Sequence, residues 1–259
     1  MNSLRTILLA FFFISFSSFF PGGSSFEEQQ KNFQRVSDVY ERKEELFKMR
    51  CRSHEVPESF SNMFIRVFKM EGMVEVWAQN NYGKYVKFNE YRIYSISGNL
   101  GPKRQLGDCQ VPEGFYYINE FNPVSNYHLS LGINYPNESD MKLSKAIKKG
   151  GSIFLHGGKT SAGCIAMSDY YIEDVYLAAV KAKNQGQQKI PVQIFPFKMT
   201  KQNMAYYTHF PQFKTHIEFW NNLQGAFLFF EKNNRIQDVS VGADGYYKFY
   251  DPASAQAFE

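Results

Sequence analysis

Two residues in one short segment have the types and spacing of a nucleophile and its base. His156 ends a short apolar stretch, Ser152 to Leu155, and Cys164 follows eight residues later, after a turn rich in glycine and small polar residues. The thiolate is the reactive form of cysteine, and a thiol with a pKa of about 8.5 needs help to populate it at neutral pH. An imidazole that folds back within hydrogen-bond reach can take the thiol proton. The segment therefore predicts nucleophilic catalysis through Cys164, with His156 as base.

Neighbouring residues of this segment have predicted roles as well. Gly163 allows close approach of the backbone, so the amides of Gly163 and Cys164 are expected to point at a developing oxyanion. Ser161 is expected to shape the loop or to hydrogen-bond near the thiol, and a purely structural role in the turn is the alternative.

Simpler interpretations of the same residues stay open. A single cysteine is often a small buried side chain, and a histidine at a strand end is often a capped surface residue. One histidine and one cysteine supply half of a zinc site, and no C-x-x-C or H-x-x-x-H pair completes it. We therefore expect no metal and no cofactor.

The segment resembles the active-site signature of the L,D-transpeptidase (YkuD-type) catalytic-domain family. The similar residues are His156-Gly157, then Ser161-x-Gly163-Cys164 and Met167. Further stretches are similar to the family at Gly101-Pro-Lys with Gly107-Asp108, at Pro112-Glu-Gly-Phe-Tyr116, and at Asn134-Tyr-Pro-Asn137 with Asp140. Ile194 to Thr200 is similar to the end of the domain in the YafK-like branch. The resemblance implies a β-rich sandwich in which the cysteine attacks a peptidoglycan stem peptide and the histidine is its base.

The segment departs from the commonest form of the family signature at three points, and these departures indicate which branch of the family it resembles. Ala166 stands where arginine is commonest, Ala162 stands where a basic or aromatic residue is frequent, and the His-to-Cys spacing is short. All three features are similar to the YafK-like branch, which is associated with detaching lipoprotein from peptidoglycan. The resemblance also implies substrate contacts at Gly157 and Ala162.

A glycine-rich loop, Gly98 to Asp108, carries Lys103 and Arg104. We expect these two cations to face the carboxylates of a peptide stem, and an ordinary solvated loop is the alternative. The loop lacks the spacing of a nucleotide-binding loop.

Composition places the site in an ordinary globular protein. The 259 residues are 44% hydrophobic and 21% charged, and 26 Phe with 17 Tyr favour a sheet-rich fold. The net charge of +4, without a basic stripe, excludes a nucleic-acid partner. The predicted class is mainly β with flanking helices (α+β), an L,D-transpeptidase-type β-sandwich or distorted barrel. The predicted division is a signal peptide (1–25), an N-terminal helical segment (26–60), a catalytic domain (61–200) and a C-terminal extension (201–259).

The first residues read as an export signal. Arg5 precedes an apolar run from Ile7 to Phe20, and small residues suited to cleavage follow up to Ser25. The run is shorter than the ~20 residues that span a bilayer, so an uncleaved anchor is the weaker alternative. The predicted location is the periplasm, an oxidising compartment. There Cys51 and Cys109 either form a disulfide or remain free thiols, and the sequence leaves both open.

The remaining patterns predict the elements around the site. An amphipathic helix is expected over 26–52, packing on its own core or binding a partner. A hairpin is expected around Glu71-Gly72, and further predicted elements are strands at 85–88, 91–96, 115–119 and 152–155, a lid over 121–150, a helix over 168–182 and a closing strand at 190–195. Ser168 is expected to cap the helix, and the dipole at the helix N-terminus is expected to lower the pKa of Cys164. In the extension we expect helices at 200–207 and 213–223 and a hairpin at 239–249. It either covers the back of the sheet or forms a small partner-binding module.

The sequence thus predicts an exported cysteine acyl-transfer enzyme. Its expected partners are peptidoglycan stem peptides and, as a further candidate, a wall-attached lipoprotein. The thioacyl-enzyme is resolved by an amine or by water. A catalytically inactive peptidoglycan-binding module is the alternative, and Ala166 is its main support.

Overall fold

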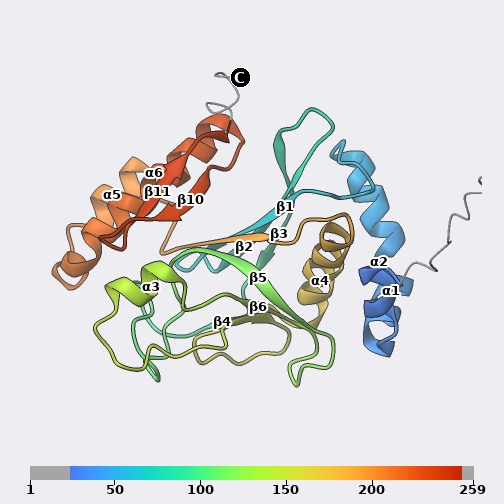
Figure 1. Cartoon of the computed structure of the whole chain (residues 1–259), viewed down its shortest axis with the longest axis horizontal. Helices are drawn as coiled ribbons and strands as arrows, with labels where there is room; N and C mark the ends of the chain where they lie inside the picture. Colours follow the sequence, from blue (N-terminus) through green and yellow to red (C-terminus); the bar gives the residue numbers. More distant parts are fainter. Residues whose placement is uncertain (1–23, 253–259) are drawn as a thin grey trace, which may run out of the picture.

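A computed structural model describes residues 24–252 of the chain. A curled β-sheet, shaped as a half-barrel, forms the centre, and helices flank it on both sides (Figure 1). This confirms the predicted mainly β class with flanking helices. The predicted signal peptide falls almost wholly on residues 1–23, outside the described part. Within 24–252, the helices are all too short or too polar to cross a membrane.

The sheet has nine strands in the order β3-β2-β1-β9-β5-β6-β7-β8-β4. Their bounds are β1 Met63–Phe68, β2 Met73–Gln79, β3 Tyr85–Arg92, β4 Ser95–Ile96, β5 Gly114–Asn122, β6 Ser130–Ile133, β7 Phe154–His156, β8 Ile165–Ala166 and β9 Pro191–Phe195. The first part of β5 pairs with β9 and the last part pairs with β6, with a register shift after Ile118. Because an irregularity of this kind bends a strand, β5 curls the two halves of the sheet toward each other.

Most predicted strands are confirmed, and one of them is divided between two strands of the structure. The β1–β2 hairpin turns at Glu71-Gly72, and Gly72 has the positive φ of 58° that such a turn requires. Ser95–Ile96 leaves the meander and pairs with β8, so the predicted strand 91–96 is divided between β3 and β4. The predicted strand at 190–195 is confirmed as β9, which lies inside the sheet, parallel to β1 and antiparallel to β5. Strand β6 was not predicted, since it falls in the expected lid.

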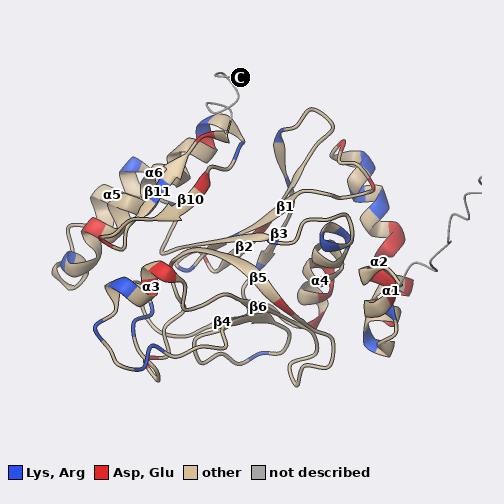
Figure 2. Ribbon diagram, viewed as in Figure 1, with Lys and Arg blue, Asp and Glu red and all other residues tan. Residues whose placement is uncertain are grey.

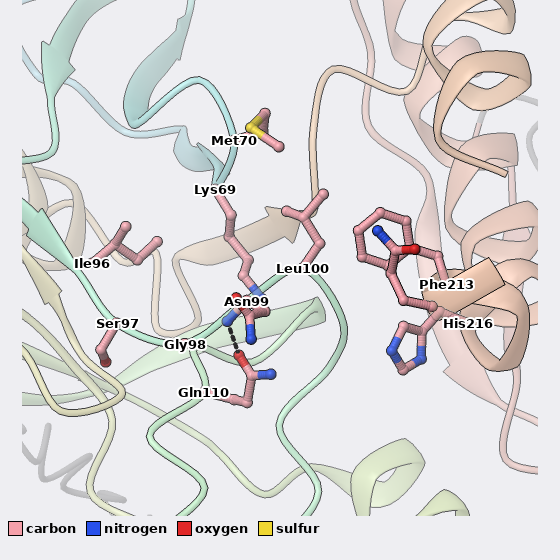
Figure 3. A pocket seen from close by; sticks show the side chains of 11 residues that line it. Lys69, Met70, Ile96, Ser97, Gly98, Asn99, Leu100, Gln110, Phe213 and His216 are labelled. Carbon is pink, nitrogen blue, oxygen red and sulfur yellow. Dashed lines mark hydrogen bonds between the residues drawn. The ribbon is translucent and has the colours of Figure 1, made fainter. Parts of the chain in front are cut away.

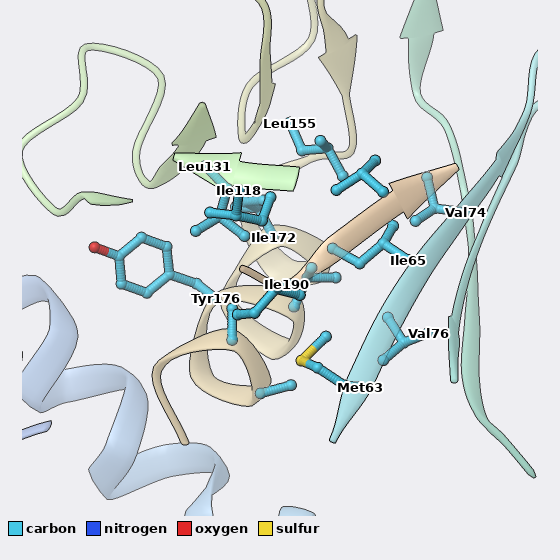
Figure 4. Close-up of a cluster of buried hydrophobic side chains, with 14 of the residues drawn as sticks. Met63, Ile65, Val74, Val76, Ile118, Leu131, Leu155, Ile172, Tyr176 and Ile190 are labelled. Atoms are coloured by element: carbon cyan, nitrogen blue, oxygen red, sulfur yellow. The ribbon is translucent and has the colours of Figure 1, made fainter. Parts of the chain in front are cut away.

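Helix α4 (Asp169–Asn184) fills the hollow of the curled sheet. Its Ile172 and Tyr176 pack among residues of β1, β2, β5, β6 and β7 (Figure 4). The same cluster takes the odd-numbered residues of β1, while Phe64 and Phe68 pack on the opposite side. Because β1 is covered on both faces, its sequence is continuously apolar apart from Arg66.

The N-terminal segment forms two helices, α1 (Phe26–Lys31) and α2 (Gln34–Ser53), beside α4 (Figure 1). This confirms the predicted helix with one break, and it shows that the helix packs on its own core. Several charged side chains of this segment are buried in ion pairs with α4. Lys43 is buried between Glu173 and Asp174 of α4, and Lys181 of α4 bonds to Glu27 and Glu44.

The C-terminal residues form α5 (Lys201–Tyr207), the 3-10 helix η1 (Pro211–His216), α6 (Ile217–Asn233) and the hairpin of β10 (Asp238–Val241) with β11 (Tyr247–Tyr250). They pack on the side of the sheet opposite α4 (Figure 1). The cluster joins Phe68, Phe195 and Phe197 to Trp220 and Phe227 of α6. The extension thus covers the back of the sheet, as the first of the two sequence interpretations expected.

Only one short helix, α3 (Glu138–Leu143), lies in the expected lid. Asn137 caps it by accepting a hydrogen bond from the Asp140 amide, and the Asp140 carboxylate accepts one from the Asn137 amide. The loop after α3 carries three basic residues, Lys145, Lys148 and Lys149 (Figure 2).

Candidate active site

Strand β7 carries His156 at its carboxyl end, next to β6 and β8. The side chain is only 3% exposed, and its Nδ1 lies 2.5 Å from the carbonyl oxygen of Gly157. Because a carbonyl can only accept a hydrogen bond, Nδ1 carries the proton and Nε2 of the neutral ring carries the lone pair. Burial lowers the pKa of His156, and the Gly157 carbonyl only partly opposes this. The imidazole is therefore neutral at neutral pH, with Nε2 as its basic atom.

Tyr127 covers the imidazole, a contact that no pattern in the sequence indicates. The two rings are 4.6 Å apart between centroids and tilted by 38°, while half of the tyrosine surface stays exposed. Tyr127 comes from the loop between β5 and β6, 29 residues before the histidine, so no local pattern connects the two. It gives the ring an outer wall on the solvent side.

Gly157 has no room for a side chain. A Cβ there would lie 2.5 Å from Oδ1 of Asp169 and 2.7 Å from the Tyr127 carbonyl oxygen. The Asp169 carboxylate accepts a hydrogen bond from the Gly158 amide at 2.7 Å and thereby ties the start of α4 to this loop. Ser168 occupies the N-cap position, but its side chain makes no capping bond, so the predicted capping role is wrong.

Cys164 follows the glycine-rich loop and immediately precedes β8. Its Sγ lies 3.7 Å from the Ser152 carbonyl oxygen. Burial raises the pKa of the Cys164 thiol, and the Phe154 amide together with the positive charge of Lys103 offsets part of that effect. The sequence predicted a lower pKa from the N-terminus of α4. That prediction is wrong because β8, Met167 and Ser168 separate Cys164 from the helix, and the Ser168 amide is bonded to the Gly158 carbonyl.

The register of β7 and β8 decides how the imidazole and the thiol are related. Leu155 pairs with Ile165 and His156 with Ala166, so Ala166 projects from the same face as His156. Continuing the alternation by one residue before β8 puts Cys164 on that face as well. Within residues 24–252, no hydrogen bond joins the imidazole to the thiol, contrary to the sequence expectation. Sγ is turned toward Ser152 instead. Ala166, where the common signature has arginine, is fully buried beside His156.

Ser97, for which the sequence predicted no role, holds the loop between His156 and Cys164, residues 157–163, which we call the nucleophile loop. Its Oγ accepts a hydrogen bond from the Gly163 amide at 2.6 Å and donates one to the Cys109 carbonyl at 2.8 Å. Ser161 Oγ donates to the Cys164 carbonyl at 2.6 Å. The Gly163 amide is thus engaged with Ser97, which differs from the predicted oxyanion role. The Cys164 amide has no partner in the described part of the chain.

Lys103 and Arg104 already have carboxylate partners within the protein. Lys103 is buried and paired with Asp108, and Arg104 bonds to Asp140 at 2.9 Å. A substrate carboxylate would therefore compete with Asp108 and Asp140 for these cations. Ala162 is exposed at the tip of the nucleophile loop.

The other two cysteines are free thiols, one buried (Cys51) and one exposed (Cys109). The disulfide alternative left open by the sequence is therefore not formed. In the described residues, no group of three or more His, Cys, Asp or Glu side chains is arranged to hold a metal ion.

Comparison with known proteins gives a family match. The L,D-transpeptidase catalytic domain (YkuD) matches residues 63–194. The chain is 31% identical over 201 residues to "Putative L,D-transpeptidase YafK" of Escherichia coli (strain K12), covering 77% of this chain and 78% of that protein.

The chain is also similar to solved structures at lower sequence identity. The chain is 22% identical to a variant of the helical cell shape determining protein Pgp2 from Campylobacter jejuni, with a TM-score of 0.41 over 64% of this chain and 60% of that one. It is also 22% identical to Bd1075 of Bdellovibrio bacteriovorus, with a TM-score of 0.40 over 64% of this chain and 62% of that one.

Proposed function

The chain belongs to the L,D-transpeptidase (YkuD) catalytic-domain family, and from that premise we propose that it is an exported cysteine acyl-transfer enzyme acting on peptidoglycan. The observation that supports this most is the state of His156. Its Nδ1 is held by the Gly157 carbonyl, so Nε2 is free to act as a base on the face where Cys164 also projects.

The proposed reaction begins with proton transfer from Cys164 to Nε2 of His156. This requires Sγ to turn away from Ser152, a movement expected because catalytic hydrogen bonds often tighten only when substrate binds. Sγ then attacks the carbonyl carbon of an L-to-D linkage at the diamino acid of a stem peptide. The oxyanion formed there accepts a hydrogen bond from the Cys164 amide, and the Gly163 amide can join only if its bond to Ser97 opens.

Collapse of the tetrahedral intermediate breaks the carbon–nitrogen bond. The imidazolium returns its proton to the leaving amine, and the acyl group remains on Sγ as a thioester. Either water or a second amine then attacks the thioester, with His156 accepting its proton. Water gives hydrolysis, including release of a wall-attached lipoprotein, and an amine gives transfer. The resemblance to the YafK-like branch favours release, because that branch is associated with detaching lipoprotein from peptidoglycan.

The test uses the mature protein and two variants in which one cysteine is replaced by alanine. Each is incubated with purified peptidoglycan, with and without attached lipoprotein. Cys164→Ala is expected to lower the yield of products by about a thousandfold or more, whereas Cys109→Ala retains activity. Mass spectrometry of muropeptides and of released protein identifies the products. New cross-links or exchanged terminal residues indicate transfer, while shortened stems or freed lipoprotein indicate hydrolysis.

The result that contradicts the proposal is equally specific. If wild type and Cys164→Ala give the same products while both still bind the wall, the chain is a peptidoglycan-binding module. If Cys109→Ala is the inactive variant, the nucleophile is wrongly assigned.

A further inference from the structure

The nucleophile loop is contacted by other segments at both of its ends. Its C-terminal end is bonded to Ser97, which lines a cavity of about 620 Å³ between the loop after β4 and the 3-10 helix η1 (Figure 3). Its first residue, Gly157, contacts the loop between β5 and β6, residues 123–129, which carries Tyr127. A Cβ on Gly157 would lie 2.7 Å from the Tyr127 carbonyl oxygen, so this β5–β6 loop packs directly on the residue that follows His156.

Strand pairing secures only the two ends of the β5–β6 loop. Asn122 pairs with Ser130 across β5 and β6, and the Gly157 amide donates to the Leu129 carbonyl at 3.1 Å. Tyr127 lies between these ends, and its hydroxyl forms no hydrogen bond within residues 24–252. The position of the ring over the imidazole therefore depends on what holds the middle of the loop.

Arg35 of α2 holds the middle of the β5–β6 loop. Its Nη1 donates to the Ser125 carbonyl at 2.9 Å, to the Pro123 carbonyl at 3.5 Å and to the His128 carbonyl. Two of these carbonyls, those of Ser125 and His128, lie on either side of Tyr127 in the chain. Hydrogen bonds from a charged donor are stronger than those between neutral groups, so one guanidinium fixes the segment that bears the tyrosine.

The place of Arg35 in its helix supports this role. It is the second residue of α2, and the first turn of that helix has no acidic residue. A cation at a helix N-terminus is opposed by the positive end of the helix dipole. Arg35 also forms no ion pair within residues 24–252. Neither the helix nor a counterion accounts for a partly buried guanidinium at this position, whereas the loop carbonyls do.

We propose that Arg35 is a positioning residue, which holds the β5–β6 loop so that the Tyr127 ring stays over the imidazole of His156. The two rings are 4.6 Å apart between centroids, and the histidine beneath the tyrosine is only 3% exposed. The N-terminal helical segment thereby shapes the active site, although it precedes residues 63–194, which match the catalytic domain of the family. The part of Arg35 in catalysis rests on the proposed function, whereas its hold on Tyr127 does not.

The surroundings of His156 make this hold measurable. Burial lowers the pKa of the imidazole, and the Gly157 carbonyl opposes that effect. A histidine that loses the cover of the Tyr127 ring is better hydrated, so its pKa rises toward the ordinary value. Charged and titratable groups reach this region from each neighbouring element, namely His128 from the β5–β6 loop, Asp169 and Glu173 from α4, Lys159 from the nucleophile loop and Cys164 ahead of β8. Both carboxylates are engaged elsewhere, since Glu173 contacts His128 Nε2 at 2.8 Å and Asp169 accepts from the Gly158 amide.

The first test is an NMR titration that needs no turnover. The imidazole signals of the ¹⁵N-labelled mature protein are followed with pH, which gives a separate midpoint for each histidine. Wild-type His156 is expected to titrate below 6.5. Tyr127→Ala and Arg35→Met are expected to raise this midpoint toward 6.5. The double variant should go no further than Tyr127→Ala alone, because Arg35 acts through Tyr127.

Two matched variants serve as controls for the titration. Tyr127→Phe keeps the ring and should keep the wild-type midpoint of His156. Arg52→Met removes another arginine of α2, which is more exposed and paired with Glu58, and it should leave the midpoint unchanged. The proposal is overturned if Arg35→Met moves the midpoint no more than Arg52→Met does, or if the shifts of the two single variants add in the double variant. Should Arg35→Met not fold, Arg35→Lys is expected to give a smaller rise, and no rise overturns the proposal as well.

A kinetic measurement then asks whether this hold serves the reaction. On peptidoglycan fragments, the acid limb of kcat/KM reports the pKa of the base in the free enzyme. Arg35→Met should move this limb upward together with the NMR midpoint, which lowers activity on the acid side by about twofold or more relative to the neutral plateau. An acid limb that stays at its wild-type position overturns the role in the reaction.

The two measurements separate this inference from the proposed function. If the wild-type chain shows no turnover, the proposed function is lost, and the NMR titration alone decides whether Arg35 positions Tyr127. A midpoint that rises in Arg35→Met and Tyr127→Ala then still supports the hold on the tyrosine.

Discussion

Burial favours the uncharged forms of both His156 and Cys164. It lowers the pKa of the imidazole and raises the pKa of the thiol, and neither group is bonded to the other. The resting pair is therefore a neutral imidazole and a protonated thiol, in contrast to a preformed thiolate–imidazolium pair. In the proposed mechanism Cys164 gives its proton to His156 before Sγ attacks the substrate, so His156 is needed as a base at each turnover.

The pH dependence of acylation follows from these directions. His156 must be neutral to accept the proton, and its pKa lies below the ordinary value of 6.5. We expect the acylation rate to stay constant through neutral pH and to fall only on the acid side of 6.5. Iodoacetamide labelling of Cys164 without substrate should rise with pH and reach its midpoint above 9.0, because burial disfavours the thiolate. An acid midpoint above 6.5, or labelling that is already maximal at neutral pH, would contradict this assignment.

At the scale of elements, buried carboxylates hold the glycine-rich loop and α3 in place. Asp140 of α3 is 1% exposed and bonds to Arg104, to the Tyr116 hydroxyl and to the Asn137 amide. Burial raises the pKa of Asp140 to about 6, and Arg104 acts against that rise. Arg104, which the sequence placed opposite a substrate carboxylate, is thus the counterion of Asp140 within the fold.

Replacing Arg104 tests that role. Arg104→Met leaves the Asp140 carboxylate without its counterion, and we expect a loss of about 3 kcal/mol in the free energy of unfolding. The substitution raises the pKa of Asp140 further, so the loss is larger at neutral pH than at mildly acidic pH, where Asp140 is protonated and needs no cation. Urea denaturation at both pH values measures it. Lys145→Met, which removes an exposed cation from the loop after α3, serves as the control, and an equal effect of the two substitutions would refute the structural role.

At the scale of the whole molecule, one buried cluster joins the extension to the sheet. Trp220 of α6 is fully buried and donates from Nε1 to Glu113 at 2.8 Å. Glu113 also accepts from Lys69 at the end of β1 and from the Gly101 amide. Trp220 belongs to the same buried cluster as Phe68, Phe195 and Phe227. The proposed catalytic domain and the C-terminal extension should therefore unfold together.

Removing the tryptophan measures that coupling. Trp220→Ala creates a cavity and deprives Glu113 of a donor, with an expected cost of about 4 kcal/mol. Tyr82→Ala, at an aromatic that is 73% exposed in the β2–β3 turn, should change stability by less than about 0.5 kcal/mol. A single transition in calorimetry is expected for wild type and for both variants. Separate melting of residues 201–252 would show that the extension is an independent unit.

The sequence by itself determined what local patterns encode. The turn at Glu71-Gly72, the helices on either side of the sheet, the strand that ends at His156 and the family signature around Cys164 were all readable from neighbouring residues. Alternation of apolar residues and turn chemistry act over a few positions, so these features depend little on the rest of the chain.

Only the tertiary structure decided which distant residues meet. It inserted β9 between β1 and β5, set Ser97 against Gly163 and Tyr127 over His156, and gave Lys103 and Arg104 partners inside the protein. It also reversed the expected direction of the pKa of Cys164, because burial depends on all the elements packed around a group. Spacing along the chain carries no information on such contacts, since they arise when strands far apart in sequence come to lie side by side.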